Sequence, residues 1–278
     1  MIETVFSHHG DCRLRSAKSR YFPLFSLLCF VLTAALASGD KPDARQLKDA
    51  TGIATGLAIH LGTTDGELES ALAADGKMLV HGLALDDAAR RRAAATIEKV
   101  QRTGLASVQH RPDISRLPYA DNLANLVIAD FDDLGERAPR EAEVLRILAP
   151  RGVAYLKQNG KWQLTRKPLP AEMDQWPQYW HSATGNPVSQ DTIVSPPTGV
   201  QWMGGIDSEG TMPQNGYRIA DGTVVYEAKL DRDRSVMICR DAFNGLIRWS
   251  VIRNHDRFFP HFKSKPLLNV DSRIFTVL

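Results

Sequence analysis

The apolar positions between residues 41 and 157 fall into short continuous runs, separated by segments with helical spacing. The runs predict strands at 58–61, 78–83, 106–109, 126–129 and 152–156, and the spacing predicts helices at 65–74, 87–103 and 140–148. Short apolar strands that alternate with helices are typical of a parallel sheet with right-handed crossovers. The predicted apolar positions of the first two helices are Leu68, Ala71 and Leu72, and Ala88, Ala95, Ile97 and Val100.

After Val200 the apolar positions recur at every second residue instead. This pattern predicts antiparallel strands within 216–226, 235–240 and 246–252, and Asn244-Gly245 is a common hairpin dipeptide. The segment 271–276 repeats the pattern of 221–226, and repeats of roughly 40–50 residues are typical of propeller blades. The sequence therefore predicts an α/β, Rossmann-like domain at 41–157, followed by antiparallel β strands of an incomplete propeller at 201–278. Closed propellers have about four to eight blades, so we expect missing blades, or a partner strand, to cover an exposed edge.

The segment 158–200 between these two regions has little periodicity and many prolines. Trp162, Trp176 and Trp180 also lie in it. Tryptophan-rich segments usually pack against other parts of a protein, so we expect an ordered, irregular linker.

The first 37 residues have the composition of a secretory signal peptide. Four basic residues lie between Arg13 and Arg20, an uncharged and mostly apolar run covers 22–34, and Ala35-Leu36-Ala37 fits a cleavage site before Ser38. The run is short for a bilayer span. We therefore expect an exported protein, periplasmic or extracellular, with no membrane span in the mature chain. An uncleaved membrane anchor is one alternative, and a lipid anchor through Cys29 is another.

Charge and cysteine content narrow the functions further. The whole chain has a net charge of +2, and the leader holds four basic and two acidic residues, so 30 basic and 30 acidic residues remain and the mature net charge is zero. There is no basic surface to indicate a nucleic-acid partner. Cys239 is the single cysteine after the leader, which excludes an intrachain disulfide in the mature chain. His255 and His261 flank Asp256 without a third ligand, so we expect no metal.

Five blocks occur in the order strand, glycine turn, helix and strand ending in an acid. The first, Leu57-Ala-Ile-His-Leu-Gly-Thr-Thr-Asp-Gly66, is followed by blocks ending at Asp86, at Asp121, at Ala129 and at Gly152. This order resembles the class I S-adenosylmethionine-dependent methyltransferases that act on small molecules. The resemblance covers residues 57–157 and implies S-adenosylmethionine as the cofactor.

The resemblance also implies roles for individual residues. Gly62 and Gly66 match the outer glycines of the turn that passes under the methionine part of the cofactor. Asp86 matches the acid that binds the ribose hydroxyls, Asp113 the acid near the adenine amino group, and Ile114 the apolar residue beside the adenine ring. The residues alone leave other roles open, because Asp86 also fits a helix N-cap and Asp113 fits a turn residue.

The sequence departs from the family pattern in the glycine turn. His60 occupies the position of an acid, Thr64 that of the central glycine, and Arg151 replaces a glycine further along the chain. A histidine cannot accept the cofactor's ammonium group as a carboxylate does, so we expect weak or absent binding. Restoration of binding by His60→Asp would show that the pocket is otherwise sound. A histidine with its hydrogen bonds satisfied inside the core is the alternative interpretation of His60.

The second region resembles the start of a quinoprotein-like propeller. Asp241, Gly245 and Trp249 fit its Asp-x-x-x-Gly…Trp pattern. We expect no pyrroloquinoline quinone in this part, because the quinone site of such propellers needs residues from many blades. Three functions follow: an exported protein whose methyltransferase-like domain has lost catalysis, which we prefer; the N-terminal part of a quinoprotein-like redox enzyme; and an active small-molecule methyltransferase.

Overall fold

The computed structural model describes residues 42–178, 180–182, 184–194, 196, 199–203, 217–231, 233–254, 267–270 and 273–276. The predicted signal peptide, the histidines at 255 and 261, and the repeated turn at 271–272 lie outside these residues. No helix in the described part of the chain is long and apolar enough to cross a membrane.

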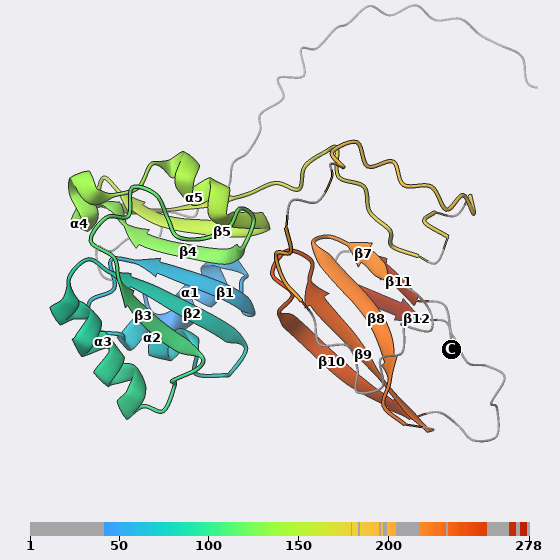
Figure 1. Cartoon of the computed structure of the whole chain (residues 1–278), viewed down its shortest axis with the longest axis horizontal. Coiled ribbons are helices and arrows are strands. Elements are labelled where there is room, and N and C mark those ends of the chain that lie inside the picture. The colour runs from blue at the N-terminus through green and yellow to red at the C-terminus, as the bar shows by residue number, and fades with distance from the viewer. Residues whose placement is uncertain are drawn as a thin grey trace, which may run out of the picture. The chain divides into compact units, whose positions relative to one another are not determined.

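The region before residue 167 forms a six-stranded sheet, called sheet A below, in the order β3-β2-β1-β4-β5-β6 (Figure 1). The first five strands pair in parallel, and β6 pairs antiparallel with β5. This confirms the predicted parallel, Rossmann-like sheet. The strands are β1 (Gly56–Leu61), β2 (Met78–Ala84), β3 (Ala106–His110), β4 (Ala124–Asp130), β5 (Leu148–Gln158) and β6 (Lys161–Arg166).

Strand β6 lies in the segment that the sequence indicated to be irregular. It forms a hairpin with β5 through Asn159 and Gly160, both with positive φ (53° and 71°). An Asn-Gly pair with two left-handed residues is a favoured tight hairpin turn. The strand has no regular alternation of buried residues, because it lies at the edge of the sheet, and periodicity therefore missed it.

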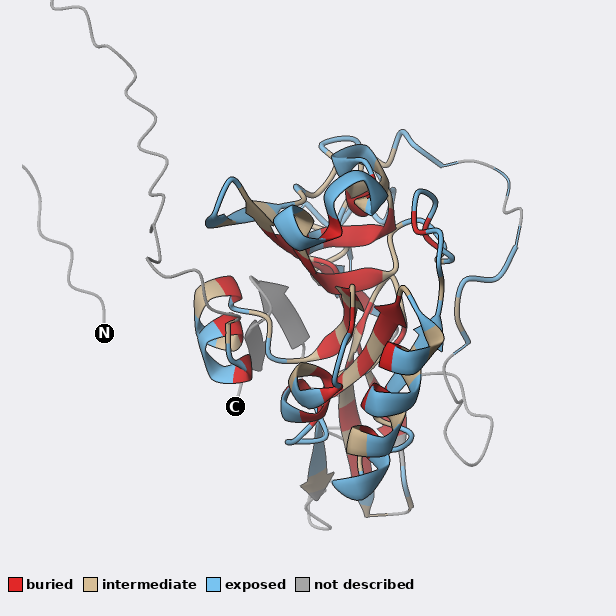
Figure 2. Cartoon of the chain, turned by 90° about the vertical axis from the view of Figure 1, so that its left-hand side faces the viewer, coloured by how far each residue is buried: buried red, intermediate tan, exposed pale blue. Residues whose placement is uncertain are grey.

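Helices cover both faces of sheet A, and two apolar clusters fill the layers between (Figures 1 and 2). Alternate residues of one strand belong to different clusters: Leu126 and Ile128 face the first three helices, whereas Val127 and Ala129 face the others. This alternation is the period of two expected for a strand buried on both faces. The helices are α1 (Ala44–Thr51), α2 (Glu67–Leu72) and α3 (Asp87–Lys99) on one face, and α4 (Phe131–Leu134), the 3-10 turn η1 (Gly135–Arg137) and α5 (Glu141–Ile147) on the other.

The predicted apolar faces of two helices were partly wrong. Helix α2 buries Glu69, Ser70 and Leu72, while Ala71 is exposed. Tertiary contacts turn this short helix so that a carboxylate rather than alanine points inward, where His60 and Thr63 bind it. Helix α3 buries an i, i+4 row, Ala89, Ala93 and Ile97, of which only Ile97 was predicted. The other predicted positions, Ala88, Ala95 and Val100, are exposed.

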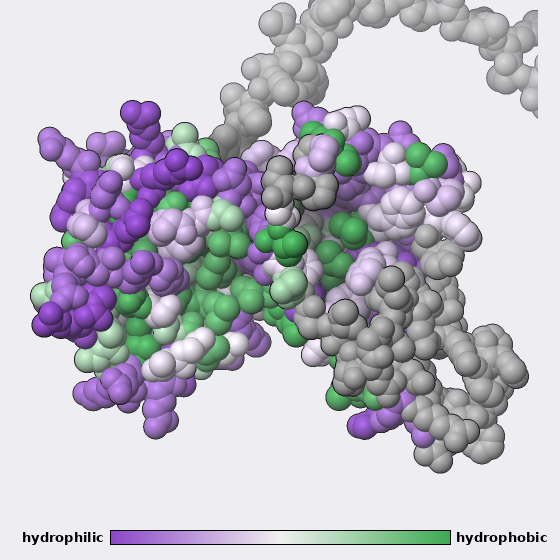
Figure 3. Space-filling model, in the orientation of Figure 1, coloured by the Kyte–Doolittle hydropathy of each residue, from purple (hydrophilic) through white to green (hydrophobic). Residues whose placement is uncertain are grey.

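Hydrophilic side chains cover most of the left-hand part of the surface in Figure 3, which holds sheet A, with hydrophobic side chains gathered between them. The helices therefore present polar outer faces to solvent, as the helical spacing in the sequence indicates.

The region after Val200 contains only antiparallel strands among its described residues, as predicted. Sheet B has the order β10-β9-β8-β7, in which every neighbouring pair is antiparallel. Its small core consists of Val225, Met237 and Cys239, with Trp249 packed against them. Burial raises the pKa of the Cys239 thiol to about 11, so it is protonated at neutral pH. The strands are β7 (Arg218–Ala220), β8 (Thr223–Lys229), β9 (Arg234–Asp241) and β10 (Ile247–Asn254), and a separate pair is formed by β11 (Leu267–Val270) and β12 (Arg273–Thr276).

Candidate functional site

A cavity of about 480 Å³ opens where β1, β2 and β4 end. Strand order reverses between β1 and β4, and the carboxyl ends of strands at such a point are where doubly wound sheets bind ligands. The volume lies within the usual range for small-molecule sites. The polar residues in its lining are Asp43, His60, Thr63, Thr64, Asp65, Glu67, Asp86, Arg92, Asp130, Asp133 and Arg137.

Gly62 begins the turn after β1 and lines the cavity. Its φ is +84°, and a Cβ there would lie 3.0 Å from Cδ2 of Leu134. The N–H groups of Gly62 and Thr63 both donate to the carbonyl of Leu83, at 2.9 and 3.0 Å. The turn therefore needs a residue without a side chain, which leaves backbone exposed to the cavity.

Gly66 has a packing role in the structure. It stands at the N-terminal end of α2 with φ +79°, and a Cβ there would lie 2.6 Å from the carbonyl oxygen of Ala93. It is not part of the cavity lining. Gly66 thus allows α2 and α3 to approach closely, and a contact with the cofactor stays a prediction.

Asp86 combines the two roles that the sequence left open. One carboxylate oxygen caps α3 by accepting the N–H of Ala89 at 2.8 Å. The side chain also lines the cavity at the end of β2. Capping uses one oxygen, so the other can accept hydrogen bonds from a ligand.

Asp113 and Ile114 lie outside the cavity lining. The Asp113 carboxylate is exposed and accepts the N–H of Ser115 at 2.8 Å, and its hydrogen bonds with Ser115 lower its pKa. Ile114 is 1% exposed and belongs to the apolar cluster beneath α5. The turn role of Asp113 is therefore present in the structure, and a role in binding adenine stays a prediction for both residues.

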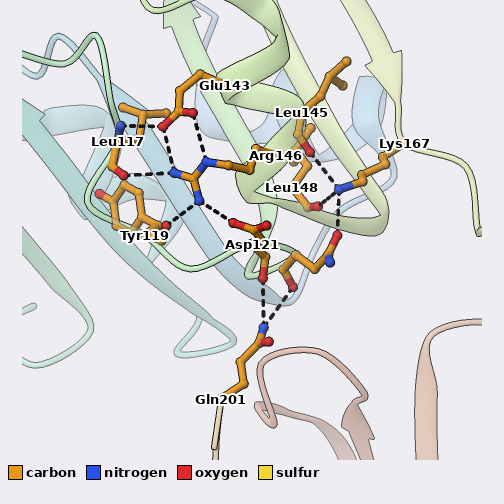
Figure 4. A network of polar contacts seen from close by, with 10 residues as sticks. Leu117, Tyr119, Asp121, Glu143, Leu145, Arg146, Leu148, Lys167 and Gln201 are labelled. Carbon is orange, nitrogen blue, oxygen red and sulfur yellow. Dashed lines mark hydrogen bonds and ion pairs between the residues drawn. The ribbon is translucent and has the colours of Figure 1, made fainter. Parts of the chain in front are cut away.

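Arg146 of α5 fixes the loop that carries these two residues (Figure 4). Its guanidinium donates to the carbonyls of Leu117 and Tyr119, and to the carboxylates of Asp121 (2.6 Å) and Glu143 (2.7 and 2.9 Å). The hydrogen bonds from Arg146 lower the pKa of Glu143 to about 2, against the opposing effect of burial. These contacts stabilise one conformation of the loop.

Asp130 contributes a largely neutralised carboxylate to the cavity. One oxygen caps α4 by accepting the N–H of Asp133 at 3.1 Å, and the other lies 2.9 Å from Nζ of Lys157. The hydrogen bond to Asp130 raises the pKa of Lys157, which is therefore a cation. Because both oxygens have partners, Asp130 has less capacity than Asp86 for a ligand.

His60 lines the cavity at the end of β1, and a buried carboxylate lies behind it. Its Nδ1 is 2.7 Å from Oε1 of Glu69, and the Thr63 hydroxyl donates to the same oxygen. Burial raises the pKa of Glu69, but the hydrogen bond and charge of His60 and the bond from Thr63 outweigh it, so the net pKa is lowered. The sequence analysis missed Glu69, since α2 contains two glutamates and only the fold decides which of them is buried.

No family profile and no curated protein sequence matches the chain. Several solved structures to which the chain is similar are described as S-adenosylmethionine-dependent methyltransferases. One from Methanococcus maripaludis, a putative member, is 23% identical over 41% of this chain and 52% of its own, with a TM-score of 0.37. One from Aquifex aeolicus is 15% identical over 47% of this chain and 73% of its own, with a TM-score of 0.37. One from Thiobacillus denitrificans, in complex with S-adenosyl-L-homocysteine, is 17% identical over 45% of this chain and 51% of its own, with a TM-score of 0.37.

The chain spans about half the length of the structures from Methanococcus maripaludis and Thiobacillus denitrificans, 52% and 51%. At these identities and TM-scores the likeness carries no argument about a ligand, and the assignment of one depends on the residues of the cavity.

Proposed function

We propose that sheet A and its helices bind S-adenosylmethionine, or a close adenosyl relative, in the cavity at the ends of β1, β2 and β4. The observation that carries this proposal is the meeting of Gly62 and Asp86 on the wall of that cavity. They come from two strands and match the glycine turn and the ribose-binding acid of the methyltransferase pattern.

The residues of the cavity fit such a ligand. A side chain at Gly62 would press on Leu134, so the exposed backbone of this turn is a surface for close approach. Asp86 has one oxygen free of the helix cap to accept the ribose hydroxyls. When bound, S-adenosylmethionine supplies a methyl group on a sulfonium, which a nucleophile can take. We assign binding to this site and no catalytic residue.

Calorimetric titration of the full chain with S-adenosylmethionine, S-adenosylhomocysteine and 5′-methylthioadenosine tests this proposal. We expect saturable binding of all three ligands, because all three contain the adenosyl group. Asp86→Asn keeps an effective N-cap and removes the charge, so it should weaken all three ligands about tenfold, as for one charge-assisted hydrogen bond. The proposal would be overturned if none of the three ligands bound saturably.

We also propose that residues 217–254 are one blade of a quinoprotein-like propeller in an exported protein. The support is the four-stranded antiparallel order of sheet B, together with the Asp241 turn. Oδ1 of Asp241 accepts the N–H groups of Phe243 and Asn244 (2.9 and 3.1 Å), and Gly245 follows with φ +73°. Further Asp-x-x-x-Gly…Trp repeats downstream in the gene would support the blade. Mass spectrometry of the exported protein should find Ser38 as the first residue, whereas a chain that retains 22–34 would indicate an anchor.

A further inference from the structure

Glu69 is a buried carboxylate with an unusual set of partners. Its side chain is 1% exposed, and Oε1 accepts hydrogen bonds at His60 Nδ1 (2.7 Å) and from the Thr63 hydroxyl. Oε2 is buried and has no hydrogen-bond partner within the described part of the chain. A buried carboxylate with one unsatisfied oxygen is costly to the fold, and such groups call for a functional explanation.

The strand beside β1 makes room for this carboxylate. Gly82 of β2 pairs with His60, and a Cβ at Gly82 would lie 2.8 Å from Oε1 of Glu69 and would also overlap the Thr63 hydroxyl. His60, Thr63 and Glu69 therefore form one packed unit beneath the glycine turn. Of its members, His60 and Thr63 line the cavity.

The contact between His60 and Glu69 sets the position of the proton on the imidazole ring. An ionised carboxylate can only accept hydrogen bonds, so Nδ1 must be the nitrogen that carries the hydrogen. In the neutral ring, Nε2 then has a free lone pair and is an acceptor. The pair of neutral His60 and ionised Glu69 has a net charge of −1, the same as a single carboxylate.

We propose that Glu69 is a positioning residue that, through His60, makes Nε2 the acceptor for the ammonium group of a bound S-adenosylmethionine. This inference rests on the function proposed above and changes the meaning of His60. The sequence suggested that histidine at this position weakens binding, because a carboxylate is lost. In the structure the Glu69 carboxylate lies behind His60, and the imidazole ring connects this carboxylate to the cavity.

Comparison of three ligands separates this role from a merely structural one. S-adenosylmethionine and S-adenosylhomocysteine carry the amino acid end, and 5′-methylthioadenosine lacks it. The Glu69→Gln amide can donate to Nδ1, which moves the ring hydrogen to Nε2 and removes the acceptor. We expect Glu69→Gln to weaken the first two ligands about ten- to hundredfold, as for a charge-assisted hydrogen bond, and to leave 5′-methylthioadenosine within about twofold.

The matched control is Glu98→Gln, which changes an exposed glutamate of α3 outside the cavity lining and should alter no affinity. Equal weakening of all three ligands by Glu69→Gln would show a structural role and overturn the inference. Absence of binding to the wild type would instead overturn the proposed function. His60→Asp adds a second test, because it places a second carboxylate next to Glu69, and like charges side by side disfavour ionisation of both. Alone, it should weaken S-adenosylmethionine binding relative to the wild type, and combined with Glu69→Gln it should bring the affinity back toward the wild-type value. Tighter binding by His60→Asp alone would contradict the inference.

One measurement on the wild type needs no variant and covers the case in which Glu69→Gln fails to fold. Nitrogen-15 spectra of the imidazole should show the hydrogen of neutral His60 on Nδ1, next to Glu69. The opposite tautomer would overturn the proposal.

Discussion

The turn after β1, 62–66, and the turn between β9 and β10, 241–245, share three features. Each spans five residues, ends in a glycine with positive φ and contains an aspartate. Sequence patterns for such turns are similar, yet the two differ in how their polar groups are used. This difference distinguishes a site that can bind a ligand from a turn whose polar groups only stabilise the fold.

In the second turn, every oxygen of the acid has partners within the protein. Oδ1 of Asp241 accepts two backbone N–H groups, and Oδ2 accepts from Asn125 Nδ2 and from the Arg248 guanidinium, both at 2.7 Å. The side chain is 1% exposed. A carboxylate whose hydrogen-bonding capacity is used up inside the fold has none left for a ligand.

Beside the first turn, at the ends of β1 and β2, hydrogen-bonding capacity is left over and faces a cavity. The second nitrogen of His60 and the second oxygen of Asp86 are not needed by the contacts that hold these side chains. Unused acceptors on a concave surface are what a polar ligand requires. The comparison predicts that substitutions at the second turn affect stability, and that substitutions of the residues around the first turn affect binding unless they alter packing.

The largest effect should come from Asp241→Ala, which leaves Arg248, Asn125 and two backbone N–H groups without their acceptor. Breaking a buried network of this kind costs about 3–5 kcal/mol of the free energy of unfolding, measurable by urea denaturation. The control is Asp231→Ala, which removes an exposed partner of Arg234 and should cost far less, because solvent screens exposed ion pairs. Equal losses for the two variants would contradict the structural role of Asp241.

Gly66→Ala should follow, with a loss of about 2–3 kcal/mol from left-handed strain and from the clash with Ala93. Gly76→Ala is the control for strain alone, since Gly76 has φ +71° and open space at its Cβ, and it should cost about 1 kcal/mol. Thermal unfolding compares the two. If both variants lost the same stability, the contact between α2 and α3 would not be what requires glycine at residue 66.

Substitution of Glu143 tests whether the contacts of Arg146 stabilise the fold, as those of Asp241 do. Because its pKa falls from 4.5 to about 2 in the folded chain, the stabilisation is present above pH 4.5 and is lost as pH falls toward 2. Glu143→Gln should destabilise the protein by about 1 kcal/mol at pH 7, after solvent screening. Urea denaturation at several pH values should show this difference vanishing in acid, while Glu141→Gln, an exposed neighbour, shows none. A difference independent of pH would exclude the ion pair as its cause.

The smallest effect concerns Arg151, which departs from the family glycine and has φ +70°. Its guanidinium lies 2.6 Å from Asp221, and both Arg151→Gly and Arg151→Ala remove this contact. The glycine variant should be more stable than the alanine variant by about 1 kcal/mol, because only glycine adopts left-handed φ without strain. Thermal unfolding of the two variants measures the difference, and equal stabilities would show that the backbone relaxes at this residue.

The sequence alone predicted the five parallel strands of sheet A and the antiparallel strands after Val200, but not α1, α4 or β6. Continuous apolar runs such as 126–129 specify strands buried on both faces, and alternation after Val200 specifies strands of the other kind, because burial periodicity is a local property of the backbone. The same local logic located Gly62 and Asp86, which follow directly after strands. Residues at the ends of adjacent parallel strands meet at one edge of the sheet, so these two could be placed together before the structure was known.

The tertiary structure decided which polar groups are buried and with what partners. Nothing local distinguishes Glu69 from Glu67, and Asp113 matches its motif position yet lies exposed in a loop held by Arg146. The environment of His60 likewise comes from α2 and from the space left by Gly82 on β2. Burial of a charge depends on contacts between segments distant in sequence, and on the packing that excludes water there. Local periodicity carries no information about either.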